Sequence, residues 1–293
     1  MLDIALGRRR TAMKPHWTLD DIPWSDIEPD KVDQDLLEAI KAAALVEANS
    51  VDYVTYLHNV FAADASFKQA ASHWGVEERQ HGDALGKWAQ IVDRSFDFER
   101  CLTEFRAGYQ IPLDAETSVR GSPTGELVAR CVVESGTCSF YSAIRDASRE
   151  PVLQQIAGFI AQDEARHYLL FKTHLRRYLQ NRKMNILSRC KIAFRRVAET
   201  DDDELAYAYY SANIALHSDA EKYDRATCAR EYARRTLQLY QFKHVRAAVH
   251  MILNATDLNP AGRFARFGVW LGWKAVKWRA RQLQRGAENL TAL

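Results

Sequence analysis

Apolar residues recur every three or four positions through most of the chain, which is the spacing of one face of an α-helix. The first such stretch covers residues 36–57, and a second covers residues 66–92 after a short turn. Proline, which interrupts helices, is absent from residues 31–111. Asp64 stands just before the second stretch, where its side chain can cap the first turn of a helix. This part of the chain is therefore expected to fold as two long helices.

The rest of the chain continues the same pattern. Residues 93–115 are mixed in character and can hold a short helix, and glycine and proline within residues 121–125 mark a break. Further helices are expected over residues 126–147, 151–179, 187–199, 203–221 and 226–254, with Pro151 in the first turn of the second. Asp201, Asp202 and Asp203 are placed to begin the helix at residue 203. No stretch alternates like a β-strand, so the expected fold class is all-α.

These elements indicate one domain with three parts. Residues 1–31 form an N-terminal arm, which prolines interrupt and which apolar residues such as Trp17 and Trp24 can pin to a core. Residues 32–182 form a four-helix core. Residues 183–293 add helices that complete the same domain and end in a basic, aromatic helix.

Composition narrows the classes of function. The 293 residues are 47% hydrophobic, and 40 Lys and Arg balance 38 Asp and Glu, so a nucleic-acid partner is not expected. Five cysteines occur without a CxxC pair, which argues against a disulfide framework, a zinc ribbon or an iron–sulfur cluster and favours a reducing cytoplasm. The N-terminus lacks the apolar stretch of a secretory signal, and no apolar run approaches the roughly 18 residues that span a bilayer.

Two segments share the pattern acid-Glu-x-x-His, at residues 77–81 and 163–167. Residues three apart on a helix share a face, so Glu78 and His81 can bind one ion together. Glu164 and His167 can do the same. One such motif often arises by chance, so a metal site needs further ligands.

Two isolated glutamates are the candidates for those ligands. Glu47 and Glu134 each lie in an otherwise apolar helical stretch, where a buried carboxylate requires compensation, although each could instead lie at the solvent edge of its helix. Glu47 and Glu78 are 31 residues apart, with the predicted turn midway between them. Glu134 and Glu164 are 30 apart, with the break near Pro151 midway. Each hairpin therefore returns its second glutamate to the depth of its first.

Four carboxylates and two histidines at one depth in a bundle form the ligand set of a carboxylate-bridged pair of metal ions. The predicted ligands are Glu47, Glu78, His81, Glu134, Glu164 and His167. Such a set favours two iron ions, with manganese an option in one or both positions, over zinc or copper. Metal-bound imidazoles usually donate their second N–H to a carboxylate, so Asp163 can orient His81 and Glu77 can orient His167. Both acids could instead lie on the surface.

At these motifs the sequence resembles the soluble acyl-acyl carrier protein desaturases of the ferritin-like superfamily. The segment EERQHGDALGKW (residues 77–88) is similar to that family's EENRHGDLLNKY, and GFIAQDEARH (residues 158–167) is similar to its GTIAADEKRH. The resemblance implies a ferritin-like di-iron four-helix bundle over residues 32–182. It also implies a role in oxygen activation for Thr137, although a helical threonine often bonds only to its own backbone.

The resemblance implies a di-iron, O2-dependent oxidoreductase that abstracts hydrogen from a C–H bond of a fatty-acyl substrate. The implied partners are acyl carrier protein or another acyl carrier and an external ferredoxin-like electron donor, and a homodimer is a further option. Two alternatives stay open. One is a di-iron oxygenase that hydroxylates or N-oxygenates a small molecule. The other is a non-catalytic ferritin-like protein that handles iron or scavenges peroxide.

The last predicted helix, residues 263–285, combines basic and aromatic side chains. Its apolar members are Phe264, Phe267, Trp270, Leu271, Trp273, Val276 and Trp278, and its basic members include Lys274, Lys277, Arg279, Arg281 and Arg285. Such a helix can make peripheral contact with an anionic membrane or dock an acidic carrier protein. It can also simply pack its aromatic residues on the bundle.

Overall fold

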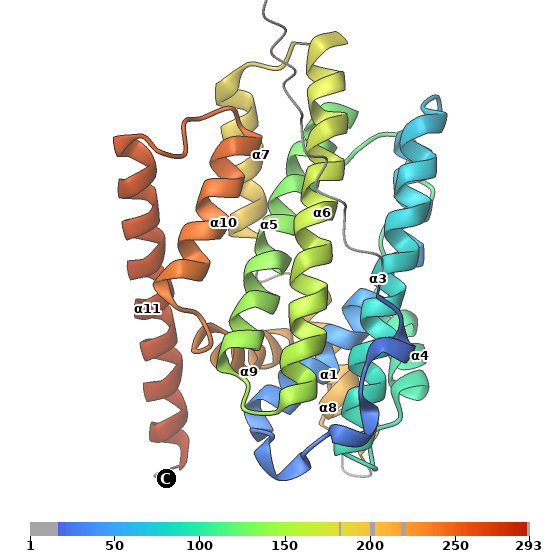
Figure 1. The fold of residues 1–293 in the computed structure, drawn as a ribbon, viewed down its shortest axis with the longest axis vertical. Coiled ribbons are helices and arrows are strands. Elements are labelled where there is room, and N and C mark those ends of the chain that lie inside the picture. The colour runs from blue at the N-terminus through green and yellow to red at the C-terminus, as the bar shows by residue number, and fades with distance from the viewer. Residues whose placement is uncertain (1–16, 182, 200–202, 218–220, 292–293) are drawn as a thin grey trace, which may run out of the picture.

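The computed structural model describes residues 17–181, 183–199, 203–217 and 221–291. This part of the chain is helical and contains no strand, which confirms the all-α fold class (Figure 1). Three short 3₁₀ helices, η1 (Leu19–Asp21), η2 (Trp24–Asp26) and η3 (Pro29–Lys31), precede the first α-helix. The α-helices are α1 (Gln34–Ala48), α2 (Ser50–Val60), α3 (Ala65–Val92), α4 (Phe98–Gly108), α5 (Pro123–Ala147), α6 (Pro151–Asn181), α7 (Ile186–Ala198), α8 (Asp203–Asn213), α9 (Arg225–Leu237), α10 (Phe242–Ala255) and α11 (Arg263–Thr291).

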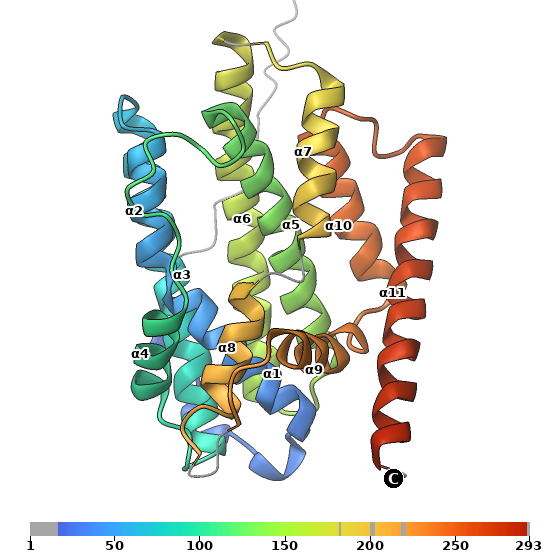
Figure 2. The same ribbon diagram turned by 180° about the vertical axis from the view of Figure 1, so that it is seen from behind.

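The centre of the bundle is the antiparallel pair α5 and α6, which lie side by side in both views (Figures 1 and 2). Glu150, a buried carboxylate in the turn between them, accepts hydrogen bonds from the backbone N–H groups of Val152 (3.1 Å) and Leu153 (2.7 Å). It also accepts a bond from the indole N–H of Trp88 in α3 (2.8 Å). One side chain therefore caps α6 and fixes α3 against it.

Helices α1 and α3 approach each other closely at a glycine. A Cβ atom at Gly82 would lie 2.6 Å from the backbone nitrogen of Ala48, so the two backbones touch there without an intervening side chain. Gly82 follows His81, and Ala48 follows Glu47. The contact therefore fixes the depth of these two predicted ligands relative to each other.

The prediction of one helix over residues 36–57 is wrong, because Asn49 divides it into α1 and α2. Asn49 has a non-helical backbone (φ −83°, ψ 8°). Arg106 of α4 donates hydrogen bonds to the carbonyl oxygen of Ala48 (2.9 Å) and to Oδ1 of Asn49 (3.3 Å). An arginine distant in sequence thus satisfies the acceptors at the break.

The predicted starts of other helices are confirmed. Asp64 caps α3 by accepting a bond from the Phe67 N–H (3.0 Å), and α6 begins at Pro151. The short helix expected within residues 93–115 is α4. Asp203 begins α8, whereas Asp201 and Asp202 lie outside the described residues.

Two C-terminal helices are shorter than predicted. The helix expected over residues 203–221 ends at Asn213, and the one expected over residues 226–254 is divided into α9 and α10. At this second break, the Nδ1 of His244 accepts a hydrogen bond from the backbone N–H of Gln241 (3.0 Å) and so caps α10. His244, which the apolar spacing places inside one continuous helix, therefore caps the first turn of a new helix.

The described part of the N-terminal arm lies against α3 and α6. Gln80 donates a hydrogen bond to the carbonyl oxygen of Trp17 (3.0 Å), and the Lys87 ammonium lies over the ring of Trp24 (4.2 Å). Residues 1–16 of the predicted arm lie outside the described residues, and the division into one domain with boundaries after residues 31 and 182 stays a prediction. Among the described helices, none has the length and apolarity needed to cross a bilayer.

Candidate metal centre

Six predicted ligands come together between four helices. Glu47 comes from α1, Glu78 and His81 from α3, Glu134 from α5, and Glu164 and His167 from α6. Each is at most 7% exposed. The structure therefore brings together every residue of the predicted set, although their role as ligands stays a prediction.

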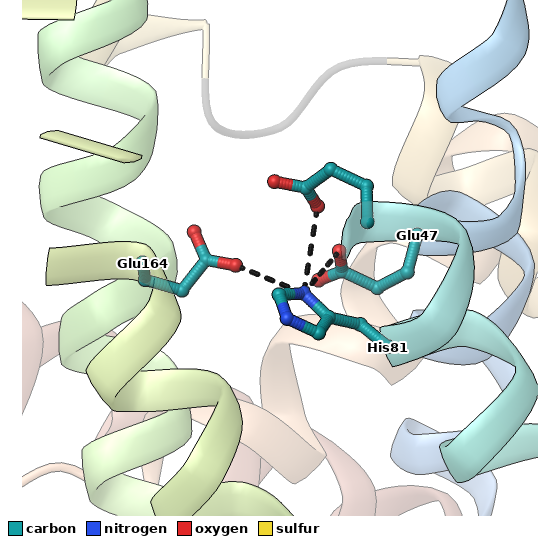
Figure 3. A group of neighbouring side chains, drawn as sticks. Glu47, His81 and Glu164 are labelled. Carbon is teal, nitrogen blue, oxygen red and sulfur yellow. Dashed lines mark ion pairs between the residues drawn. The ribbon is translucent and has the colours of Figure 1, made fainter. Parts of the chain in front are cut away.

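The first group of ligands surrounds His81. Its Nδ1 lies 3.7 Å from a carboxylate oxygen of Glu47, 3.7 Å from one of Glu78 and 3.3 Å from one of Glu164. Figure 3 shows the carboxylates of Glu47 and Glu164 pointing at this imidazole from opposite sides. Ligands on opposite sides of one ion lie about 4.2 Å apart when the bonds are about 2.1 Å long, so these distances suit a shared ion.

The second group surrounds His167. Its Nδ1 lies 3.0 Å from a carboxylate oxygen of Glu78, 3.7 Å from one of Glu134 and 3.9 Å from one of Glu164. Within each group of four, the ligand atoms lie within 4.8 Å of one another. Glu78 and Glu164 belong to both groups. The arrangement therefore offers two adjacent ion positions that share two carboxylates.

The outer nitrogen of each histidine faces the acid that was predicted to orient it, Asp163 for His81 and Glu77 for His167. His81 Nε2 lies 3.1 Å from Oδ2 of Asp163, and His167 Nε2 lies 2.5 Å from Oε2 of Glu77. A carboxylate at this nitrogen holds the proton there and leaves Nδ1 free to bind a metal. Both acids therefore occupy the predicted positions.

The inward-facing atoms show that the site fits metal ions. Within the described part of the chain, no hydrogen bond reaches His81 Nδ1, His167 Nδ1, Glu134 Oε1 or Glu164 Oε1, although all four atoms are buried. Unsatisfied buried polar atoms are costly, and several that converge on one space fit the ligand shell of a bound ion. Four ionised glutamates also balance the charge of two divalent cations.

The part of the sequence that carries this site matches a family profile. A sequence profile described as fatty acid desaturase matches residues 46–197. The chain belongs to the fatty acid desaturase family. The matched range contains all six predicted ligands and excludes the N-terminal arm and helices α8–α11. No curated protein matches the chain.

Family membership identifies the chain coarsely as an oxidoreductase of fatty-acid chemistry.

The charges of the site agree with a metal centre. Burial, with the neighbouring carboxylate of Glu78, raises the pKa of Glu47 well above its usual range. Burial and the carboxylate of Glu164 do the same for the pKa of Glu134. Burial opposes the charged form of His167, but hydrogen bonds to Glu77 and Glu78 outweigh it and raise its pKa to about 10. Protons or metal ions must therefore neutralise the cluster.

The hydroxyl of Thr137 contacts both its own helix backbone and one of the predicted ligands of this desaturase-family chain. The hydroxyl lies 3.3 Å from the backbone carbonyl oxygens of both Val133 and Glu134, one turn earlier in α5. It also donates a hydrogen bond to the carboxylate of Glu164, which belongs to both ligand groups. Its role in oxygen activation stays a prediction.

Two further residues contact the ligands and were not predicted to do so. The Tyr141 hydroxyl donates to Oε1 of Glu47 (2.5 Å), and the Trp17 indole N–H donates to Oδ2 of Asp163 (2.8 Å). The Trp17 ring also stacks on His81, with centroids 6.1 Å apart and planes within 1°. Tyr141 lies two helical turns after Glu134, a spacing that could have revealed it. Nothing in the local sequence connects Trp17 with His81.

Replacement of Asp163 by asparagine (Asp163→Asn) is expected to weaken metal binding about 10- to 100-fold, the usual cost of losing a carboxylate behind a ligating histidine. Competition with a chelator measures the affinity. Asp146→Asn is the matched control, because Asp146 lies 2.9 Å from His244 Nε2 in a similar pair outside both ligand groups. Equal weakening in the two variants, or none in Asp163→Asn, would contradict the assignment.

Proposed function

We propose that this protein is a di-iron, O2-dependent oxidoreductase that removes hydrogen from a C–H bond of a fatty-acyl substrate. The observation that carries the proposal is the pair of buried ligand groups sharing Glu78 and Glu164, on a chain of the fatty acid desaturase family. Each group supplies carboxylate oxygens and one imidazole, a donor set that suits iron and also accepts manganese.

The proposed reaction converts adjacent CH2 groups into a double bond. One acyl chain, one O2, two electrons and two protons give one unsaturated chain and two molecules of water. Bound iron would supply the activation of O2, and the protein supplies the environment. The electrons come from an external donor of the ferredoxin type, since the sequence carries no cysteine motif for a cluster of its own.

The chain's own residues hold the ligands and control protons in this proposal. Trp17 and Asp163 fix the orientation of His81 through the contacts described above, and Tyr141 fixes that of Glu47. Thr137 has its hydroxyl on Glu164, so it is placed to pass a proton to the space between the ligands. The burial of all six ligands keeps bulk water away from the reactive centre.

A cavity of about 290 Å³ on the α5 side of the centre is the proposed binding space for part of the acyl substrate. It reaches Val133, the neighbour of Glu134, and its lining combines apolar side chains such as Ile111 and Val119 with charged ones such as Glu126. The lining also includes Arg130, whose guanidinium lies over the rings of Tyr53 (4.7 Å) and Trp74 (5.9 Å). Its volume is near the lower end of the range typical of ligand sites. Acyl carrier protein, or another acyl carrier, is the proposed means of delivery.

The test begins with the full chain, stripped of metal and reconstituted with Fe(II) without oxygen. We expect two irons per chain and an optical spectrum that changes on exposure to O2. With ferredoxin, its reductase and a saturated acyl-acyl carrier protein, the expected product lacks two hydrogens and O2 is consumed in step with it. Manganese reconstitution run in parallel identifies the active metal.

The controls separate the alternatives. A product with one oxygen added, from a free acid or an amine, would replace the proposal with an oxygenase. Rapid iron oxidation without any acyl product would indicate an iron-handling protein. A chain that binds neither iron nor manganese would overturn the proposal as a whole.

A further inference from the structure

The end of the chain has a strong excess of positive charge. Residues 242–285 contain nine Lys and Arg and one acid, Asp257, whereas the whole chain contains 40 Lys and Arg and 38 acids. That acid already forms an ion pair with Arg189 of α7. The rest of the chain therefore carries a net negative charge, and α10 and α11 carry the compensating positive charge.

Helix α11 lies at the outer edge of the bundle, against α10 and α9 and on the side opposite α3 and α4 (Figures 1 and 2). One side of it is packed. Ala265 and Val269 are at most 2% exposed, and Gly272 lies close to Val245 of α10. Small residues of α11 therefore form much of its contact with the bundle.

The opposite side of α11 exposes large apolar residues. Phe267 is 60% exposed, Trp270 50%, Leu271 52% and Trp278 65%. These positions recur at helical spacing along one stripe. The interpretation that the aromatic residues pack on the bundle is therefore wrong for Phe267, Trp270 and Trp278, although Trp273 does pack edge-on against Phe242 (6.2 Å).

Cations accompany the exposed aromatic residues along the same helix. The Lys274 ammonium lies 5.9 Å from the centre of the Trp270 ring, and the Lys277 ammonium lies 5.5 Å from that of Trp273. No acidic residue occurs in residues 263–285. Tryptophan interleaved with lysine and arginine on one exposed face is typical of helices that lie in the headgroup region of an anionic bilayer. The aromatic rings enter the boundary of the acyl chains, and the long cationic side chains reach the phosphates.

We propose that the outer face of α11 binds the surface of an anionic lipid membrane, with the helix lying flat on the bilayer and the metal centre remaining outside it. The occupant is a membrane rather than a second copy of the chain, because a symmetric pairing of this face would bring two sets of cations together with no acidic residue in residues 263–285 to neutralise them. A membrane also matches the shape of the surface. A single convex helix at the edge of the bundle offers a ridge, which a fluid interface can surround more readily than a folded protein can.

Sedimentation of the full chain with lipid vesicles tests the proposal. Binding is expected with vesicles that contain phosphatidylglycerol, with much weaker binding to phosphatidylcholine alone and a loss of binding at high salt. The variant K274Q/K277Q/R281Q should bind about 100-fold more weakly, because each cation near an anionic surface contributes roughly fivefold. The variant F267Q/W270Q/W278Q should also lose vesicle binding. Its loss should already be seen at low salt, where the natural chain binds.

The matched control is R94Q/R100Q/R176Q, which removes three exposed cations that lie outside α10 and α11. It should bind vesicles like the natural chain, and all three variants should keep the circular dichroism and metal content of the natural chain. Equal losses in the K274Q/K277Q/R281Q variant and in this control would reduce the effect to net charge and overturn the proposal. Two results would overturn the proposal in favour of a protein partner. The first is capture of acyl carrier protein through α11 without any binding to vesicles. The second is a dimer of the natural chain that the α11 variants dissociate. None of these readouts depends on the proposed oxidation.

Discussion

A chain carrying Glu164→Gln is expected to lose metal from both ligand groups at once. Oε1 of Glu164 lies 3.3 Å from Nδ1 of His81 and 3.9 Å from Nδ1 of His167, and among the residues that the structure describes only Glu78 is shared between the two groups in the same way. Glutamine keeps the shape and removes the charge. Because the loss of a carboxylate behind a ligand already weakens metal binding 10- to 100-fold, we expect a decrease of at least about 100-fold for both ions.

Glu134→Gln is the graded control for this variant, because Glu134 belongs only to the group around His167. It should keep one firmly bound ion per chain, whereas Glu164→Gln should keep none, as measured by elemental analysis after dialysis. Retention of two ions in Glu164→Gln would refute a shared carboxylate.

The Glu164→Gln substitution should also stabilise the metal-free protein. Burial and the neighbouring carboxylates raise the pKa of Glu134 and of Glu47, which shows that the glutamates repel one another when no ion neutralises them. Removal of one buried charge relieves this repulsion. The metal-free Glu164→Gln chain is therefore expected to unfold at a higher temperature than the metal-free natural chain. Added Fe(II) should raise the unfolding temperature of the natural chain only.

The second large effect is expected from Gly82→Ala. A Cβ atom at this position would lie 2.6 Å from the backbone nitrogen and 2.8 Å from the Cα of Ala48, and a helix backbone cannot yield as a side chain can. Helices α1 and α3 must move apart, at an expected cost of about 1–3 kcal/mol in the free energy of unfolding. Because Glu47 precedes Ala48, the movement should also lower the metal affinity of the group around His81 more than that of the group around His167.

Gly136→Ala makes the same chemical change where there is room for it. No atom lies within 4 Å of a Cβ at Gly136, which is exposed on α5 only two residues from Glu134. Alanine in a helix interior should raise the free energy of unfolding by about 0.5–1 kcal/mol. Denaturant unfolding of the two metal-free variants measures the difference. Equal stability in both would show that the α1–α3 contact does not set the helix spacing.

The position of the ligands could be predicted because it depends on local rules. A helix advances a fixed distance per residue, so the equal arms of the hairpins around residues 62 and 149 return Glu78 and Glu164 to the depths of Glu47 and Glu134. The pairing of Asp163 with His81 follows from the same register. Periodicity and spacing are sufficient even though Asn49 divides the first hairpin, because the break lies two residues after Glu47 and the rest of that arm, Ser50–Val60, is helical.

The break at Asn49 could not be predicted because a distant residue stabilises it. The apolar spacing continues through Asn49, and it is Arg106 of α4 that satisfies the acceptors there. The same holds for Trp17, whose position over His81 depends on the path of an arm that carries no helical pattern. Side chains that act across the fold leave no trace in the spacing of their own segment.

The position of Trp17 also affects how the protein should be produced. The family profile begins at residue 46, so a fragment trimmed to the matched range would discard the indole that holds Asp163 and covers His81. Such a fragment would retain all six ligands and yet open one of the two histidines to solvent. For expression, crystallisation or transplantation of this centre into another scaffold, the minimal functional unit starts well upstream of the first ligand, and a purification tag belongs at a distance from residue 17.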